Sequence, residues 1–255
     1  MKTDMKKILY SLLIGLLALT ACNEKDEPDS DIETIKVNGV SFNMVKVKGG
    51  NLTMNMEIWS DWGFVYHRDT TLNVTVGDFR IGQTEVTQAL WLAVMGENPS
   101  YFSSNNDKRV FEDDFNRPVE NVWWDDCQEF IEKLNKLTGR HFRIPSEAEW
   151  QFAARGGNKT HDYPYAGSDN IDEVAWWFEN SDGMTHPVGQ KKANELGLYD
   201  MSGNVMEWCY MPLSGYSFRV CRGGSYFSKY FMWKSVYSSD QGEVRGSDIG
   251  LRLAE

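Results

Sequence analysis

Residues 143–157 read RIPSEAEWQFAARGG, a stretch whose local structure follows from its own residues. Ser146 with Glu149 three positions later forms a capping box, in which each side chain hydrogen-bonds the backbone of the other end of the first helical turn. Gly156 and Gly157 then favour a stop, because glycine destabilises a helix interior. The stretch predicts a short strand over residues 142–145 followed by a helix that begins after Ser146.

The clearest helix is predicted just upstream, from Trp124 to Thr138, and Gly139 supplies its stop. Its apolar residues recur every three or four positions, and the charged residues fall between them. The apolar set is Trp124, Cys127, Phe130, Ile131, Leu134 and Leu137. We therefore expect Cys127 on the core face, where a buried free cysteine behaves as a small hydrophobe.

Further upstream the pattern is typical of strands. Apolar residues alternate over 35–55, around Gly39 and the Gly49-Gly50 pair, and again over 72–81. Thr87 can then cap a helix that ends at Gly96. Beyond residue 157 the chain is rich in glycine and aromatic residues and has little periodicity, as in segments that carry function. These features predict an α+β domain with unusually much loop.

The N-terminus predicts export and lipidation. A charged start at residues 1–7 precedes an apolar run over 8–19, shorter than the roughly 20 residues that span a bilayer. The run ends at Leu19-Thr20-Ala21-Cys22, which resembles a bacterial lipobox with Cys22 as the acylated residue. We interpret residues 1–22 as a lipoprotein signal peptide, and expect the multiple acyl chains on Cys22 to anchor the protein to a membrane.

Residues 23–34 predict an acidic tether, because residues 23–31 have no apolar side chain to bury. Their start resembles the export signal that Bacteroidetes place after the lipidated cysteine, which implies an outer membrane protein exposed on the cell surface. A generic linker on a protein that faces the periplasm is the alternative. Residues 35–255 then fit one large domain.

Composition excludes several classes of function. The net charge of −11, with no basic stripe, opposes binding to nucleic acid. The four histidines are scattered without zinc spacing, and no phosphate loop or nucleophile elbow occurs in the sequence. Without Cys22, the cysteines are Cys127, Cys209 and Cys221. Because this number is odd, at least one is expected to stay unpaired or buried, whichever two could pair.

Five motifs in order carry a family resemblance. They are Gly82–Thr87, Arg143–Trp150 with Ala153–Gly157, Gly197–Trp208, Arg222–Tyr226 and Gly250–Arg252. Together they resemble the sulfatase-modifying-factor, or formylglycine-generating-enzyme-like, family. The resemblance implies a loop-rich variant of the C-type lectin fold. It does not fix function, because sites are grafted onto folds.

The resemblance also implies where catalysis would occur. In the oxidases of this family, two cysteines after the Gly-Gly-Ser motif bind copper(I), an ion that prefers soft thiolates. The matching positions here are Ser228 and Trp233. A serine hydroxyl is a hard ligand and an indole offers none, so copper binding and oxidase chemistry are not expected.

The resemblance implies a calcium site that does survive. In the family, a loop matching Asp200, Gly203, Val205 and Glu207 binds calcium through two carboxylates and two carbonyls. Such hard oxygen ligands suit Ca²⁺. The alternative is a structural turn, in which Gly203 supplies a positive φ and Glu207 pairs with Arg222 or Arg252.

A second family calcium site would use Asp182, the Met184 carbonyl and a position near Trp176. Tryptophan stands there in place of the asparagine of the family, although Asn180 is close. This second site is therefore the weaker expectation.

The leading interpretation is a non-oxidase lipoprotein that binds a protein or glycan partner, similar to structural lipoproteins of Bacteroidetes gliding and secretion machinery. A divergent formylglycine-generating oxidase is the alternative. Ser225, Tyr226, Ser228 and Trp233 are the candidate cleft residues. Several aromatic residues could line a groove, but aromatics are more often core, and that interpretation is favoured. The set is Trp123, Trp124, Trp176, Trp177, Tyr226, Tyr230, Phe231 and Trp233.

Overall fold

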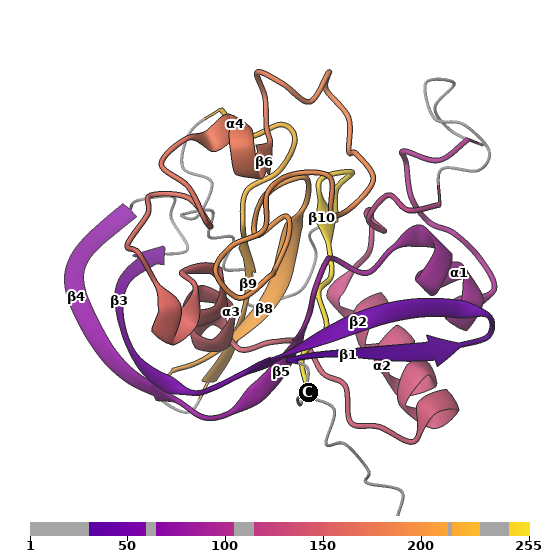
Figure 1. The fold of residues 1–255 in the computed structure, drawn as a ribbon, viewed down its shortest axis with the longest axis horizontal. Helices are drawn as coiled ribbons and strands as arrows, with labels where there is room; N and C mark the ends of the chain where they lie inside the picture. Colours follow the sequence, from indigo (N-terminus) through magenta and orange to yellow (C-terminus); the bar gives the residue numbers. More distant parts are fainter. Residues whose placement is uncertain (1–30, 60–64, 105–114, 214–215, 230–244) are drawn as a thin grey trace, which may run out of the picture. The chain divides into compact units, whose positions relative to one another are not determined.

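A computed structural model describes residues 31–59, 65–104, 115–213, 216–229 and 245–255, and Figure 1 shows their arrangement. The residues from Asp31 to Glu255 form one compact unit. Short strands, helices and long connections are mixed along the chain, so the predicted α+β class is confirmed. Among the described residues, no helix has the length and apolar content needed to cross a membrane.

The first sheet has the strand order β1, β2, β5, formed by Ile32–Val37, Val40–Val47 and Phe79–Gly82. All of its pairs are antiparallel. Beyond β5, backbone hydrogen bonds from Arg80 and Gly82 to Glu255 and Leu253 add the C-terminal segment beside it. Residues near both ends of the described chain therefore complete one layer.

This sheet corrects the predicted boundary between tether and domain. Residues 32–34 belong to β1 and not to a tether that continues to residue 34. Glu33 forms an ion pair with Arg140, and Ile35 and Val37 are buried. The acidic residues among positions 31–34 are typical of a linker, but Glu33 is held in the strand by a partner more than 100 residues away in sequence.

Strands β3 (Gly50–Trp59) and β4 (Val65–Val76) form a long antiparallel hairpin that curves beside helix α3. Helix α3 (Glu147–Ala154) packs against this hairpin on one side and against β8 and β9 on the other. Ser146 and Glu149 make the expected capping box. Residues 142–145, predicted as a strand, contribute only an isolated bridge between Arg143 and Ala254.

The remaining helices follow the predicted pattern. Helix α1 (Gln88–Met95) begins after the cap Thr87 and ends at Gly96, and α2 (Trp124–Thr138) ends at Gly139. They pack on each other, and their apolar faces share one core cluster that includes Cys127. A single turn of helix, α4 (Ile171–Val174), and the 3-10 turn Gly157–Lys159 lie in the loop-rich part.

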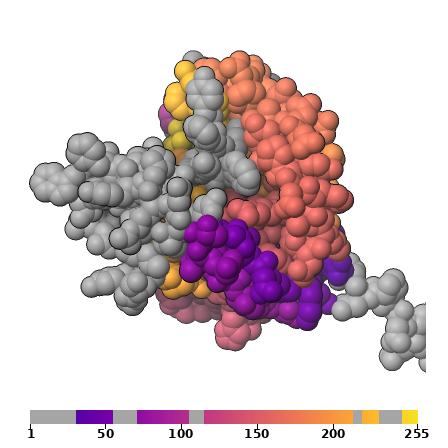
Figure 2. Space-filling model, turned by 90° about the vertical axis from the view of Figure 1, so that its left-hand side faces the viewer, coloured from indigo at the N-terminus to yellow at the C-terminus, as the bar shows by residue number. Residues whose placement is uncertain are grey.

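The loop-rich part also holds the second main sheet. Its order is β10, β8, β9, formed by Ile249–Gly250, Met206–Leu213 and Tyr216–Arg222. The pair β6 (Ala175–Trp176) and β7 (Ser202–Gly203) is short and parallel. In Figure 2, the salmon surface of the chain after α3 makes up much of the visible face above the purple β3–β4 hairpin. The irregular segments are thus a large part of that surface.

Candidate functional site

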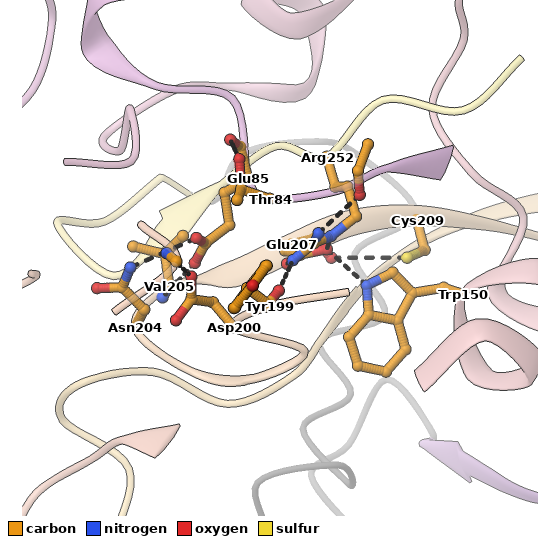
Figure 3. Close-up of polar contacts among 12 residues, drawn as sticks. Thr84, Glu85, Trp150, Tyr199, Asp200, Asn204, Val205, Glu207, Cys209 and Arg252 are labelled. Atoms are coloured by element: carbon orange, nitrogen blue, oxygen red, sulfur yellow. Dashed lines mark hydrogen bonds and ion pairs between the residues drawn. The ribbon is translucent and has the colours of Figure 1, made fainter. Parts of the chain in front are cut away.

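A buried ion pair lies in the predicted calcium loop (Figure 3). Glu207 of β8 accepts hydrogen bonds from Arg252 at both oxygens, at 2.7 and 2.8 Å, and neither side chain is exposed. The Glu207 Oε2 atom also accepts the Trp150 indole N–H at 2.6 Å. Arg252 donates its remaining bonds to the carbonyls of Gly82 and Tyr199. The ion pair therefore joins four segments of the chain.

Two further carboxyl groups are buried beside this pair. Glu85 lies 3.4 Å from both the Val205 amide nitrogen and the Asn204 side-chain nitrogen, which are long hydrogen bonds. Asp200 Oδ2 accepts the Gly189 amide at 2.7 Å. The other Asp200 oxygen is buried and has no hydrogen-bond partner among the described residues.

Charge at this site is unbalanced. Burial raises the pKa of Glu85 well above its usual value, and the charges of Asp200 and Glu207 raise it further. Burial also raises the pKa of Asp200 to about 6, against the opposing effect of its backbone hydrogen bond and of Arg252. One guanidinium thus faces three carboxyl groups. A proton or a cation would relieve the remaining repulsion.

The four predicted calcium ligands fit a cation only in part. The unpartnered oxygen of Asp200 is suitable, whereas both oxygens of Glu207 are already engaged. Gly203 has the expected positive φ of 85°, and a Cβ atom there would lie 2.3 Å from the Trp176 carbonyl oxygen. The structure pairs Glu207 with Arg252, as the alternative interpretation expects. Calcium stays a prediction.

Arg222, the other arginine considered for Glu207, pairs instead with the buried Glu147 of α3. At the second predicted calcium site, Asp182 has a positive φ of 54°. Trp176 stacks on His186 with ring centroids 3.8 Å apart. The Asn180 side chain accepts the backbone N–H three residues earlier and so closes a local turn. Met184 is buried nearby, and this site also stays a prediction.

The serine that matches the first copper position lies in a tight turn. Ser228 Oγ accepts the Ser225 amide at 3.0 Å and lies 3.4 Å from Ser225 Oγ. Ser225 Oγ in turn lies 3.3 Å from an oxygen of Asp248. Trp233, the second matching position, is outside the described residues. Ser225 and Tyr226 are buried, and the cleft expected beside Ser225, Ser228 and Trp233 stays a prediction.

Five aromatic rings form a continuous series around this turn, which we call the aromatic ladder. Successive ring centroids lie 5.1, 5.0, 6.3 and 6.1 Å apart. Tyr101 and Phe227 are 51% and 62% exposed. The ladder consists of Tyr101, Phe102, Tyr226, Phe227 and Phe178.

The aromatic residues singled out from the sequence are buried or partly buried where the structure describes them. Tyr226 is buried, and Trp123, Trp124, Trp176 and Trp177 are partly buried. Tyr230, Phe231 and Trp233 are outside the described residues. The exposed members of the ladder, Tyr101, Phe178 and Phe227, had no sequence signal, because exposure of a lone aromatic depends on which neighbours cover it.

The three remaining cysteines are buried and unpaired. Burial raises the pKa of each thiol, so none has thiolate character. The expectation that at least one stays unpaired or buried is confirmed.

Sequence reasoning missed two buried acids. Glu85 belongs to the motif Gly82–Thr87, which carries no sequence signal for a buried carboxyl group. Glu120 has no exposed surface, and its Oε1 atom accepts the Phe102 amide at 2.8 Å. The segment Val119-Glu120-Asn121-Val122 mixes apolar and polar residues, so it carried no signal that Glu120 would be buried.

A cavity of about 280 Å³ lies between β2, the segment 82–87 and α1, and Glu85 of the buried acidic group is one of its lining residues. Its walls include Phe42, Gln83, Thr84 and Asn116. The Asn43 and Gln83 amides bond each other there at 2.9 Å. None of the predicted site residues lines it.

Comparisons with known proteins show which family the chain resembles. A family model described as a sulfatase-modifying factor enzyme 1-like domain matches residues 30–255. The "Chaperone protein LppX" of Paenibacillus barcinonensis is 33% identical over 306 residues, covering 98% of this chain and 99% of that protein. The mouse "Inactive C-alpha-formylglycine-generating enzyme 2" is 34% identical over 122 residues, covering 43% of this chain and 37% of its own. The structure of Treponema denticola variable protein 1 matches with a TM-score of 0.71 and 30% identity, over 88% of this chain and 98% of its own.

Proposed function

The chain belongs to the sulfatase-modifying factor enzyme 1-like family, and from this premise we propose that it is a lipid-anchored, extracytoplasmic member that binds a partner protein and catalyses no oxidation. The observation that carries the proposal is the similarity, over 98% of this chain and 99% of the relative, to a protein named as a chaperone. A match over both whole lengths favours a shared role more strongly than a match of one motif.

Ligand chemistry supports the absence of oxidase activity. Ser228 offers a hydroxyl where the oxidases of the family carry a thiolate, and copper(I) prefers soft sulfur. The described thiols cannot replace it, because Cys127, Cys209 and Cys221 are buried in the core with raised pKa values. A relative named as inactive also shows similarity over part of the chain.

The aromatic ladder is the proposed contact surface. Exposed apolar patches on soluble domains commonly mark interaction sites, and two rings of the ladder, Tyr101 and Phe227, are more than half exposed. A polypeptide fits this surface better than a glycan. Sugars need polar hydrogen-bonding partners beside the rings, and the Ser225 and Tyr226 side chains are buried. Apolar side chains of an incompletely folded partner would pack on the rings.

The Cys22 anchor would keep this surface at a membrane, with residues 23–31 as a short spacer. If calcium binds, the Asp200 carboxylate and the carbonyls of Gly203 and Val205 would hold it. The ion would supply positive charge to the acidic loop and would stabilise the fold, with no role in chemistry.

The test is binding of a permanently unfolded, carboxymethylated polypeptide by the full chain, followed by fluorescence anisotropy. Phe227→Ser removes the most exposed ring of the ladder, and we expect at least tenfold weaker binding, the loss of about 1.4 kcal/mol that truncation of an interface anchor typically exceeds. Leu137→Ser is the matched control, because Leu137 is 50% exposed at the end of α2 and outside the ladder.

Equal losses in both variants would indicate non-specific hydrophobic binding. No binding by the wild type would refute the chaperone-like role. Conversion of a cysteine peptide to formylglycine would instead favour the alternative, a divergent oxidase.

A further inference from the structure

Two cations of the chain lie on aromatic rings in or close to the aromatic ladder. The Lys229 ammonium lies 4.4 Å from the centroid of Phe178, the last ring of the ladder. The Arg245 guanidinium lies 5.1 Å from the centroid of Trp123. Both cationic residues are exposed. A cation within about 6 Å of a ring centroid is attracted by the negative charge of the ring face. Rings in this region therefore hold cations even in contact with water.

The two most exposed rings of the ladder have no such cation. More than half of the surface of Tyr101 and of Phe227 is exposed. Their ring contacts are with other members of the ladder. In the part of the chain that the structure describes, no lysine or arginine lies over either ring. Both rings are thus available to a cation that a partner supplies.

Acidic side chains lie next to the ladder along the chain. Glu179 follows Phe178, and Asp182 follows Ser181, whose hydroxyl donates to the Tyr226 carbonyl at 2.8 Å. Both acids are exposed, and the whole chain has a net charge of −11. A negative surface attracts cationic partners and repels acidic ones. The charge of the chain therefore favours a positively charged segment over an acidic one.

We propose that the aromatic ladder selects polypeptide segments in which arginine or lysine stands beside apolar residues. The apolar side chains of the partner would pack along the rings, and its cation would lie on Phe227 or Tyr101. Lys229 on Phe178 is an example of this contact within the chain itself. The inference rests on the proposed function, because it takes the ladder as the contact surface, and it adds which polypeptides that surface prefers.

The first experiment compares three synthetic peptides that share the same leucine and phenylalanine positions. Their remaining positions are arginine, citrulline, which is an uncharged isostere of arginine, or glutamate. Fluorescence anisotropy measures the Kd of each peptide for the full chain. One exposed cation–π contact corresponds to roughly two- to fivefold in affinity, and charge attraction adds to it. We therefore expect the arginine peptide to bind at least fivefold tighter than the citrulline peptide, and the glutamate peptide to bind most weakly.

The second experiment separates the ring contact from attraction at long range. Salt at about 0.5 M screens charges that are far apart, so at least a twofold preference for arginine over citrulline should remain if the rings hold the cation. Phe227→Leu keeps an apolar side chain but removes the ring, and should abolish this remaining preference. Phe115→Leu is the matched control, because Phe115 is 40% exposed and lies outside the ladder. It should keep the preference.

A third variant opens a further ring. Lys229→Met removes the ammonium from Phe178, so the arginine peptide should bind at least twofold tighter in the same salt, with the citrulline peptide unchanged. Lys229 is exposed, so this change should leave the fold intact, and circular dichroism checks every variant.

The results distinguish this inference from the function on which it rests. Equal affinity for the arginine and citrulline peptides, an equal preference in Phe227→Leu and Phe115→Leu, or no gain in Lys229→Met would each overturn the selection of cations while leaving the contact surface in place. Failure of all three peptides to bind would overturn the contact surface as well.

Discussion

Replacement of Arg252 by methionine tests the electrostatic account of the buried ion pair most directly. The methionine keeps much of the apolar stem but removes a guanidinium that is fully buried and makes four hydrogen bonds. Glu207 would lose the cation that it pairs with in the described part of the chain, and Glu85 and Asp200 would lose the charge that lowers their pKa values. Breaking a buried pair on one side typically costs about 3–5 kcal/mol.

For a domain of this size, each kcal/mol lowers the melting temperature by roughly 2–4 °C, so Arg252→Met should melt about 6–20 °C below the wild type. Calorimetry and urea unfolding measure the effect. Stability of the variant should recover as pH falls from 8 toward 5. The pKa values of Glu85 and Asp200 are raised in the folded state, so the stability linked to their protons is present at low pH and is lost as pH rises.

A matched control and a double variant make the reasoning refutable. Arg219→Met removes an arginine that is 3.6 Å from an exposed carboxylate, and should cost less than about 1 kcal/mol. Adding Glu207→Gln to Arg252→Met removes the orphaned charge, so the double variant should be about 1–3 kcal/mol more stable than the sum of the single effects. If Arg252→Met loses no more than Arg219→Met, or the two changes are additive, the ion pair does not hold the site together.

Four further outcomes are expected. Cys22→Ala should move the protein from the membrane fraction to the soluble fraction, and continued membrane association would exclude the lipid anchor. Given copper(I), oxygen and a sulfatase-type cysteine peptide, the protein with Ser228 should produce no formylglycine by mass spectrometry, whereas stoichiometric conversion would contradict the non-oxidase proposal. Calcium 100-fold above its dissociation constant should stabilise the wild type by about 2.7 kcal/mol, with no shift in Asp200→Asn; identical melting curves in chelator and in excess calcium would show a purely structural turn. Glu149→Gln should cost about 1–2 kcal/mol at pH 7. The hydrogen bond and charge of Arg143 lower the pKa of Glu149 despite burial, so this stability is present above pH 4.5 and is lost as pH falls through the lowered folded-state pKa, and the difference between the two proteins should shrink on acidification.

Sequence patterns predicted the elements whose signals are local. Helix α2 has the predicted bounds because its apolar period and its Gly139 stop lie within one segment, and α3 follows from the Ser146 and Glu149 capping box. The family resemblance, and with it the loop-rich C-type-lectin-like fold, is confirmed by the family model and by the structural match.

The elements that sequence reasoning missed depend on distant partners. Strand β8 has no alternating pattern because residues 206–209 are all buried, with Glu207 satisfied by Arg252. Sequence alone also could not place Glu85, because the backbone amide that contacts its carboxylate belongs to Val205, which is 120 positions away. The boundary at residue 32 was missed for the same reason. Acidic residues are typical of a linker, and only the fold shows that Glu33 pairs with Arg140.

The position of Arg252 has a consequence for how the chain is made. Its guanidinium donates to Gly82, 170 positions earlier, and the three residues that follow it pair beside β5. During synthesis, the Gly82 carbonyl of β5 and the Glu207 carboxylate therefore lack the Arg252 guanidinium until residue 252 has been added. Pairing across such long separations is slow. The ion pair between Arg252 and Glu207 can thus form only at the end of synthesis, and a nascent chain that stops before residue 252 lacks it.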